Sequence, residues 1–200
     1  MDYQKEFFDA TYQKLVAAIE GIPDDIAADI YAFSFIMELG DTCSEPVVEF
    51  FYNTESQFRA SIDEASDEME AKWLFDFWLH DHWDWFKIDG SDDELWQQWV
   101  KSTPFYLTEE EENELRDNDE EKFWEHFHGI NTMFNDTIID LSQKLHAEGV
   151  FVMKFGKPIP VIVQFYEYGD EQLEWTLRAN PPGLADEYES WDLFDHLREK

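Results

Sequence analysis

Two pairs of histidines come closest to the spacing of a metal site. Within each pair, one residue lies between the two histidines. The pairs are His80/His82 and His126/His128. Four imidazoles with nearby Asp81 or Glu125 are ligands that transition metals accept. Residues two apart in a helix point to different faces, so either pair would chelate only from an extended or irregular backbone. We therefore expect no bound metal or other cofactor, and a metal-dependent enzyme using these pairs is an alternative.

Catalytic signatures are absent from the rest of the sequence. Cys43 is the single cysteine and follows the Gly40-Asp41 turn region, which favours an incidental thiol over a nucleophile. The sequence has no glycine-rich phosphate loop, nucleophile elbow or His-Glu-x-x-His motif. A pair of carboxylates does not identify an acid-base catalytic site in this chain, because every stretch of it is acidic. We predict a protein that is not an enzyme and has no catalytic residues.

Negative charge dominates the composition. Asp and Glu number 47 against 14 Lys and Arg, which gives a formal net charge of -33. Residues 63–128 alone hold 22 acidic and five basic residues. Such a charge repels nucleic acid and anionic membranes, so neither is an expected partner. The acidic block is either a set of solvated helix faces or an electrostatic recognition surface for a basic protein.

Tryptophans are interleaved with these acids, since six of the nine fall between Trp73 and Trp99 together with seven carboxylates. Most of these rings are expected in the core, but Trp is enriched at binding hot spots and attracts Lys and Arg through cation-π contacts. We predict that the partner binds two acidic segments rather than the strand-forming ends. The candidate partner-binding residues are Asp81, Trp83, Asp84, Trp85, Asp89, Asp92, Asp93, Glu94, Glu109, Glu110, Glu111 and Glu112.

The elements that position these residues begin with a helix. Apolar residues recur at spacings of three and four between Tyr3 and Gly21, which predicts an amphipathic helix. Residues 30–39 and 47–52 are apolar and β-prone, which predicts two antiparallel strands.

From Thr54 the pattern becomes helical and acidic. Thr108 and Glu111 form a capping-box pattern. The next helix includes Phe123, Trp124 and Phe127, with Asp117 or Asn118 as its cap, and a helical stripe then runs from Ile130 to Leu145 and ends before Gly149.

The C-terminal third is predicted to return to strands, over residues 150–155, 161–168 and 173–178. Residues 180–183 (Asn-Pro-Pro-Gly) must leave the sheet, and residues 191–197 are expected to form a short closing helix. Strands therefore flank a helical centre. We predict a single α+β domain over residues 1–200, with a mainly antiparallel sheet of about five strands packed with helices and a helical acidic central segment.

Composition also favours a folded, cytoplasmic protein. Aromatic residues make up 18% of the chain, more than disordered chains carry. One cysteine allows no internal disulfide, which suits a reducing compartment. The sequence starts with an early acid and shows neither a signal peptide nor an apolar run of about 18 residues.

The order of these elements, with residues 51–55 (Phe-Tyr-Asn-Thr-Glu), the Trp-rich middle, and Asn180-Pro181-Pro182 before Trp191, resembles an uncharacterised bacterial domain-of-unknown-function family of similar length. In general type the chain is similar to acidic immunity proteins encoded beside bacterial toxins. This likeness implies a non-enzymatic protein that neutralises a basic toxin, for example a nuclease. A nucleic-acid mimic directed at a DNA-binding protein is a second alternative.

Overall fold

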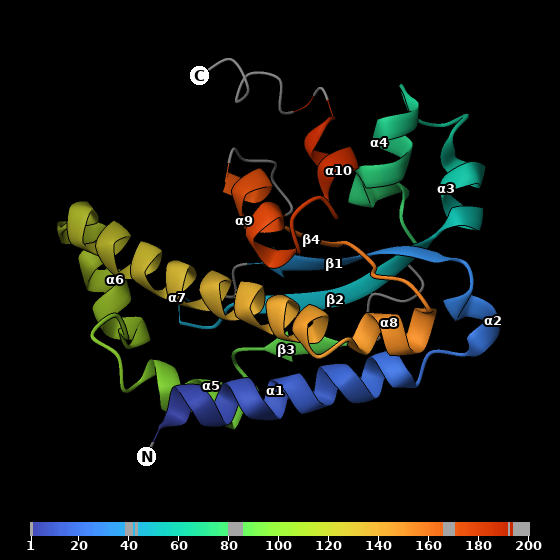
Figure 1. Cartoon of the computed structure of the whole chain (residues 1–200). Coiled ribbons are helices and arrows are strands. Elements are labelled where there is room, and N and C mark those ends of the chain that lie inside the picture. The colour runs from blue at the N-terminus through green and yellow to red at the C-terminus, as the bar shows by residue number, and fades with distance from the viewer. Residues whose placement is uncertain are drawn as a thin grey trace.

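The computed structural model describes residues 2–38, 42, 44–79, 86–165, 171–191 and 193. The fold is α+β, with one mixed sheet in the order β3-β2-β1-β4 and helices on both of its faces (Figure 1). The strands are β1 (Ile30–Glu38), β2 (Val47–Thr54), β3 (Lys87–Asp89) and β4 (Val161–Phe165). The helices are α1 (Tyr3–Glu20), α2 (Asp24–Ala27), α3 (Glu55–Ser61), α4 (Glu68–Trp73), the 3-10 turn η1 (Phe75–Phe77), α5 (Glu94–Val100), α6 (Glu109–Asn118), α7 (Glu120–Ala147), α8 (Val150–Phe155), α9 (Glu171–Ala179) and α10 (Asp186–Glu189).

The central pair of strands separates two hydrophobic cores. β1 and β2 pair antiparallel, with Phe33 opposite Tyr52 and Phe35 opposite Phe50, as their apolar runs predicted. Successive side chains of a strand point to opposite faces of the sheet. Phe33 and Phe35 therefore pack in one core, whereas Ile36 packs in the other. Both faces are buried, which explains why the residues of β1 are apolar almost without interruption.

The larger core lies between the sheet and α1, α5, α7 and α8 (Figure 1). α1 spans the predicted range and ends at Gly21, and Leu15 and Ile19 on its buried face are fully covered. α7 is a single helix of 28 residues whose stripe from Ile130 to Leu145 is buried, and Gly149 follows it with a φ of 71°. A positive φ suits glycine because it has no Cβ.

The smaller core lies on the opposite face, under α3, α4, α9 and α10 (Figure 1). Trp73, Trp78 and Tyr188 are buried there, and the rings of Trp73 and Tyr188 meet edge to face at 5.7 Å. This contact joins α4 to α10, which are more than a hundred residues apart in the sequence.

Helix α9 closes the outer edge of β4 with side chains instead of a further strand. Asn180 accepts a hydrogen bond from the Val161 amide at 2.9 Å and donates to the Val161 carbonyl oxygen at 2.7 Å. One helical turn earlier, Thr176 Oγ1 accepts from the Val163 amide at 3.0 Å. Four helical residues rise about 6 Å and two strand residues about 6.6 Å. Side chains four residues apart on the helix can therefore bond backbone groups two residues apart on β4. The edge offers few free backbone groups to another strand.

The sheet differs from the prediction in strand number and in direction. It has four strands among the described residues rather than about five, and it is mixed because β4 pairs parallel with β1. Parallel pairing needs a long crossover. The chain provides one by passing through α5, α6, α7 and α8 between β3 and β4.

Two segments predicted as strands are helices. Residues 150–155 form α8 between Gly149 and Gly156, both with φ near 70°, so the β-prone valines yield to the turns on either side. Residues 173–178 lie inside α9, whose buried residues are Gln172, Leu173, Thr176 and Ala179. That spacing of three and four is typical of a helix, so the prediction of a strand over residues 173–178 is wrong.

Smaller corrections concern helix ends. Asp119, rather than Asp117 or Asn118, caps α7 by accepting from the Lys122 amide. The predicted closing helix at 191–197 lies mostly outside the described residues, and α10 ends at Glu189, before Trp191. The Thr108–Glu111 capping box is confirmed, since each side chain bonds the backbone of the other.

Candidate functional site

Part of the predicted binding segment lies outside the described residues. Asp81, Trp83, Asp84 and Trp85 fall there, as do His80, His82 and Cys43. Predictions about these positions stay predictions.

The carboxylates around β3 and the start of α5 divide into two kinds. Asp89 accepts from the Ser91 hydroxyl at 2.7 Å and forms an ion pair with Lys87, and these contacts, led by the Ser91 hydrogen bond, lower the pKa of Asp89. Asp93 caps α5 through the amides of Leu95 and Trp96. These two carboxylates hold local structure, whereas Asp92 and Glu94 are exposed.

The four consecutive glutamates of α6 divide in the same way. Glu111 completes the capping box, and its hydrogen bonds with Thr108 lower its pKa. Glu112 is buried, with 3% of its side chain exposed, and pairs with Arg116 at 2.7 Å. Glu109 and Glu110 are exposed and face solvent. Glu109 and Glu110 are therefore the two of the four predicted glutamates that are exposed and hold no local structure, whereas Glu111 is exposed but engaged in the cap.

The exposed carboxylates of α6 continue onto the start of α7. We call residues 109–128, which form α6 and the first turns of α7, the acidic hairpin. It holds ten Asp or Glu against Arg116 and Lys122, and it extends past the ends of the strands (Figure 1). Glu114, Glu121 and Glu125 are exposed in addition to the predicted residues.

Contacts at its base hold the acidic hairpin against the body. His126 Nδ1 donates to the Phe105 carbonyl oxygen at 3.0 Å. Gly129 lets the Phe105 ring lie on the α7 backbone, because a Cβ at that position would come within 2.3 Å of the ring. Ser44 links the segment before α6 to α5. Its backbone carbonyl oxygen accepts from the Trp96 indole at 2.8 Å, and its hydroxyl donates to the Leu107 carbonyl oxygen at 3.4 Å.

Trp124 is the aromatic side chain that the acidic hairpin leaves open, with 43% of its surface exposed. Its indole N–H donates to Glu120 at 3.2 Å, and the His128 ring stacks on it at 5.8 Å. Trp124 and Phe123 line a shallow hollow of about 290 Å³ with Arg116 and Glu120. Sequence reasoning placed Trp124 in this helix without singling it out. The available signal was its position one residue off the buried stripe that includes Phe123 and Ile130.

The tryptophans between Trp73 and Trp99 are buried where the structure describes them, and the two predicted as partner-binding, Trp83 and Trp85, lie outside the described residues. Trp73, Trp78, Trp96 and Trp99 are all at most 4% exposed. Trp96 meets Phe7 and Phe134 edge to face at 5.6 and 4.9 Å, which is core packing. The prediction that most of these rings belong to the core is therefore confirmed for the four that are described.

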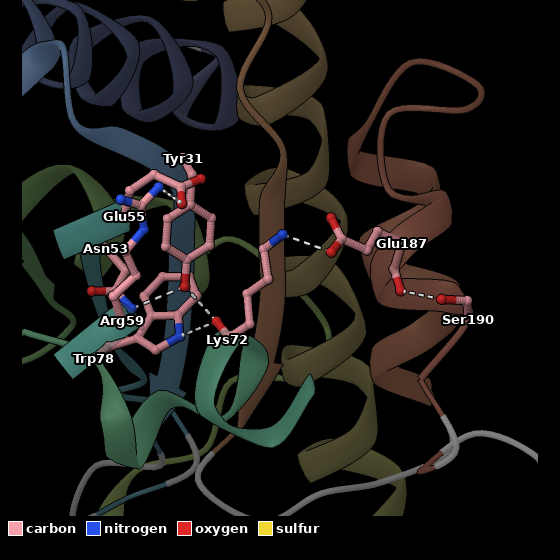
Figure 2. A network of polar contacts seen from close by, with 8 residues as sticks. All are labelled: Tyr31, Asn53, Glu55, Arg59, Lys72, Trp78, Glu187 and Ser190. Atoms are coloured by element: carbon pink, nitrogen blue, oxygen red, sulfur yellow. Dashed lines mark hydrogen bonds and ion pairs between the residues drawn. The ribbon is translucent and has the colours of Figure 1, made fainter. Parts of the chain in front are cut away.

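One basic side chain, Lys72 of α4, lies near three aromatic rings and reaches across to Glu187 of α10, as Figure 2 shows for the ion pair. Lys72 Nζ lies 5.2 Å from the ring centre of Trp73 and 5.6 Å from those of Tyr31 and Phe58, and it pairs with Glu187 of α10 at 2.6 Å. We call these five residues the Lys72 cluster. In this cluster, three rings and one carboxylate surround the Lys72 ammonium group, and the contacts join β1, α3, α4 and α10.

The backbone beneath the Lys72 cluster is also held. The Lys72 carbonyl oxygen accepts from the Tyr31 hydroxyl and from the Trp78 indole, the latter at 2.9 Å (Figure 2). Asn53 donates to the Tyr31 hydroxyl at 2.9 Å. Burial raises the pKa of Tyr31, so this hydroxyl stays protonated and able to donate.

Metal binding by the second histidine pair is disfavoured by its position in α7. His126 bonds the Phe105 carbonyl oxygen, whereas His128 stacks on Trp124, so the two rings point in different directions. Across the part of the chain that the structure describes, no group of three or more His, Cys, Asp or Glu is arranged to hold a metal ion. None of the described helices has both the length and the apolar character needed to span a bilayer.

Comparison with known proteins adds no relative. No family model, no curated protein and no solved structure matches this chain.

Proposed function

We propose that this chain is a non-enzymatic binding protein for a basic protein, and specifically a cytoplasmic immunity protein that neutralises a basic toxin such as a nuclease. The observation that carries the proposal is the acidic hairpin, where exposed carboxylates surround an exposed tryptophan. A toxin that grips phosphates must be basic, and an inhibitor gains speed and complementarity by presenting carboxylates where phosphates would lie.

This proposal is supported by the difference between carboxylates that hold local structure and carboxylates that are exposed. Solubility alone would be served by acids anywhere on the surface. In the acidic hairpin, Glu111 and Asp119 cap the starts of α6 and α7, and Glu112 pairs with Arg116, which lies over the Phe123 ring of α7. Other carboxylates of the hairpin then stand on a fixed scaffold, and a preorganised surface loses less entropy on binding.

The test uses the protein as bait in a lysate of its native organism, beside a charge-reversed variant. Glu110, Glu114 and Glu121 are exposed and serve neither as caps nor in ion pairs among the described contacts, so all three are changed to Lys. The matched control changes the exposed Glu20, Asp25 and Glu171 to Lys, which alters the net charge equally. Circular dichroism first establishes that both variants are folded.

The expected result is a basic protein retained by wild type and by the control but lost by the hairpin variant. The purified pair should form a defined complex, and co-expression should relieve the growth arrest that the partner causes. A captured protein that binds all three baits equally, or one whose toxicity the chain does not relieve, would contradict the proposal.

A further inference from the structure

The hollow beside Trp124 has the composition of a site for a cationic side chain. It lies where α6 turns into α7, and it is lined by Phe123, Trp124, Glu120 and Arg116. Trp is the most favourable aromatic partner for a cation. An open aromatic surface next to a carboxylate offers both contacts that a guanidinium or ammonium group uses.

The indole is held in place before any partner arrives. Phe127 meets it edge to face at 5.1 Å, and the stacked His128 ring lies within 28° of its plane. The hydrogen bond to Glu120 fixes the edge that carries the nitrogen. A ring restrained in this way loses little freedom when a partner covers it.

Both basic residues of the acidic hairpin are already engaged. Arg116 pairs with Glu112 and lies over Phe123 at 4.9 Å, and Lys122 pairs with Asp119 at 2.9 Å. Among the described residues no cation lies over Trp124. The hollow therefore lies in a hairpin with excess negative charge, and it contains an aromatic ring, Trp124, that no Lys or Arg of the described chain covers.

We propose that this hollow receives an arginine side chain from a basic segment of the partner, with the guanidinium against Trp124 and hydrogen-bonded to Glu120. Arginine fits better than lysine because its planar group stacks on an indole and bonds a carboxylate through two N–H groups. The Lys72 cluster shows the same combination of rings and carboxylate around a cation of this chain. The inference rests on the proposed function and names the chemical group that the surface takes.

The test is fluorine NMR of the protein labelled with 5-fluorotryptophan. Trp124→Phe assigns the Trp124 resonance by removing it. The probe is the peptide acetyl-Gly-Arg-Leu-Arg-Gly-amide at about 0.15 M salt, where long-range attraction is largely screened. The control peptide carries citrulline, an uncharged analogue of arginine, at both arginine positions.

We expect the arginine peptide to shift the Trp124 resonance with saturation and the citrulline peptide to leave it in place. Glu120→Gln should weaken the arginine peptide at least threefold, whereas Glu171→Gln should leave its affinity unchanged. A Trp124 resonance that the arginine peptide does not move, or that the citrulline peptide moves equally, overturns the inference. The proposed function fails separately, when charge reversal of the acidic hairpin leaves partner capture intact.

Discussion

The Lys72 cluster and the hollow beside Trp124 combine the same kinds of groups in opposite states. In the cluster, rings from three elements surround a lysine whose side chain is only 16% exposed, and α10 supplies its carboxylate. In the hollow, Trp124 has an adjacent carboxylate and an exposed surface. One site is filled by the chain itself, and the other is open to a partner. Aromatic and acidic side chains of the same kinds therefore stabilise the fold at one site and are left exposed at the other.

The two sites also differ in how their residues are brought together. The Lys72 cluster draws on residues from Tyr31 to Glu187 and exists only once the whole fold has formed. The hollow is built from residues between Arg116 and Trp124, a short stretch of one helical hairpin. Changes in the cluster should therefore act on stability, and changes in the hollow should act on binding.

The largest effect on stability is expected when the cluster loses its cation. Lys72→Ala removes the ion pair with Glu187 and the contacts of the lysine with three rings. We expect the free energy of unfolding to fall by about 2 to 3 kcal/mol in urea denaturation. Lys122→Ala removes an exposed ion pair and should cost at most about 1 kcal/mol. Equal losses in the two variants would show that the rings add nothing to the Lys72 ion pair.

A half-buried histidine sharpens the comparison because its ring contacts an aromatic side chain without an ion pair. His146 lies 4.8 Å from the Phe151 ring, and burial lowers its pKa from 6.5 to about 4, an effect that Asn180 partly offsets. Between these values the unfolded chain binds a proton that the folded chain does not. The free energy of unfolding should therefore decrease as the pH falls from about 6.5 towards 4.

The measurement compares wild type with His146→Gln by urea denaturation across this pH range. The stability of wild type relative to the variant should decrease by roughly 1 to 2 kcal/mol, since the ring is partly exposed. Carboxylates titrate equally in both proteins and cancel in the difference. A difference that stays constant with pH would place the pKa of folded His146 near its ordinary value.

Trp124 should show the converse behaviour. Trp124→Ala is expected to change the free energy of unfolding by about 1 kcal/mol or less, because almost half of the ring already faces solvent. Affinity for the basic partner, measured by calorimetry, should fall at least about tenfold, as at interface hot spots. Loss of stability without loss of affinity would assign Trp124 to the fold alone.

The smallest effects are expected for single exposed carboxylates at the rim of the proposed interface, outside the lining of the hollow. Glu121→Gln and Glu125→Gln each remove one exposed charge and should weaken partner binding by about 0 to 1 kcal/mol. Both effects should shrink as salt is added. A single rim substitution that abolishes binding would move the centre of the interface away from Trp124.

The sequence predicted elements whose signals are local. The apolar spacing of α1, the β1–β2 pair and the Thr108 capping box each depend on neighbouring residues, and all three are present. α8 and α9 were missed because their types depend on tertiary context. Two glycines with positive φ set the ends of α8, and the fit of Thr176 and Asn180 to the edge of β4 fixes α9.

The candidate site was predicted in part for the same reason. Charge density pointed to the glutamates of α6, but composition does not distinguish Glu110, which is exposed, from Glu112, which is buried and paired with Arg116. Trp124 is one ring among many aromatics, and its exposure follows from where α7 leaves the body of the fold. The exposure of Glu110 and of Trp124 can be predicted only once the packing of α6 on α7 is known.

The central claim is that the acidic hairpin forms the interface with a basic partner. The most direct measurement is the association rate of the captured, purified partner with wild type, with the Glu110/Glu114/Glu121 reversal and with the matched Glu20/Asp25/Glu171 reversal. The two variants have the same net charge, so only the position of the charge differs. We predict at least a tenfold slower association for the hairpin variant and less than about threefold for the control. Equal slowing in both variants would contradict the central claim, because net charge rather than the acidic hairpin would then govern recognition.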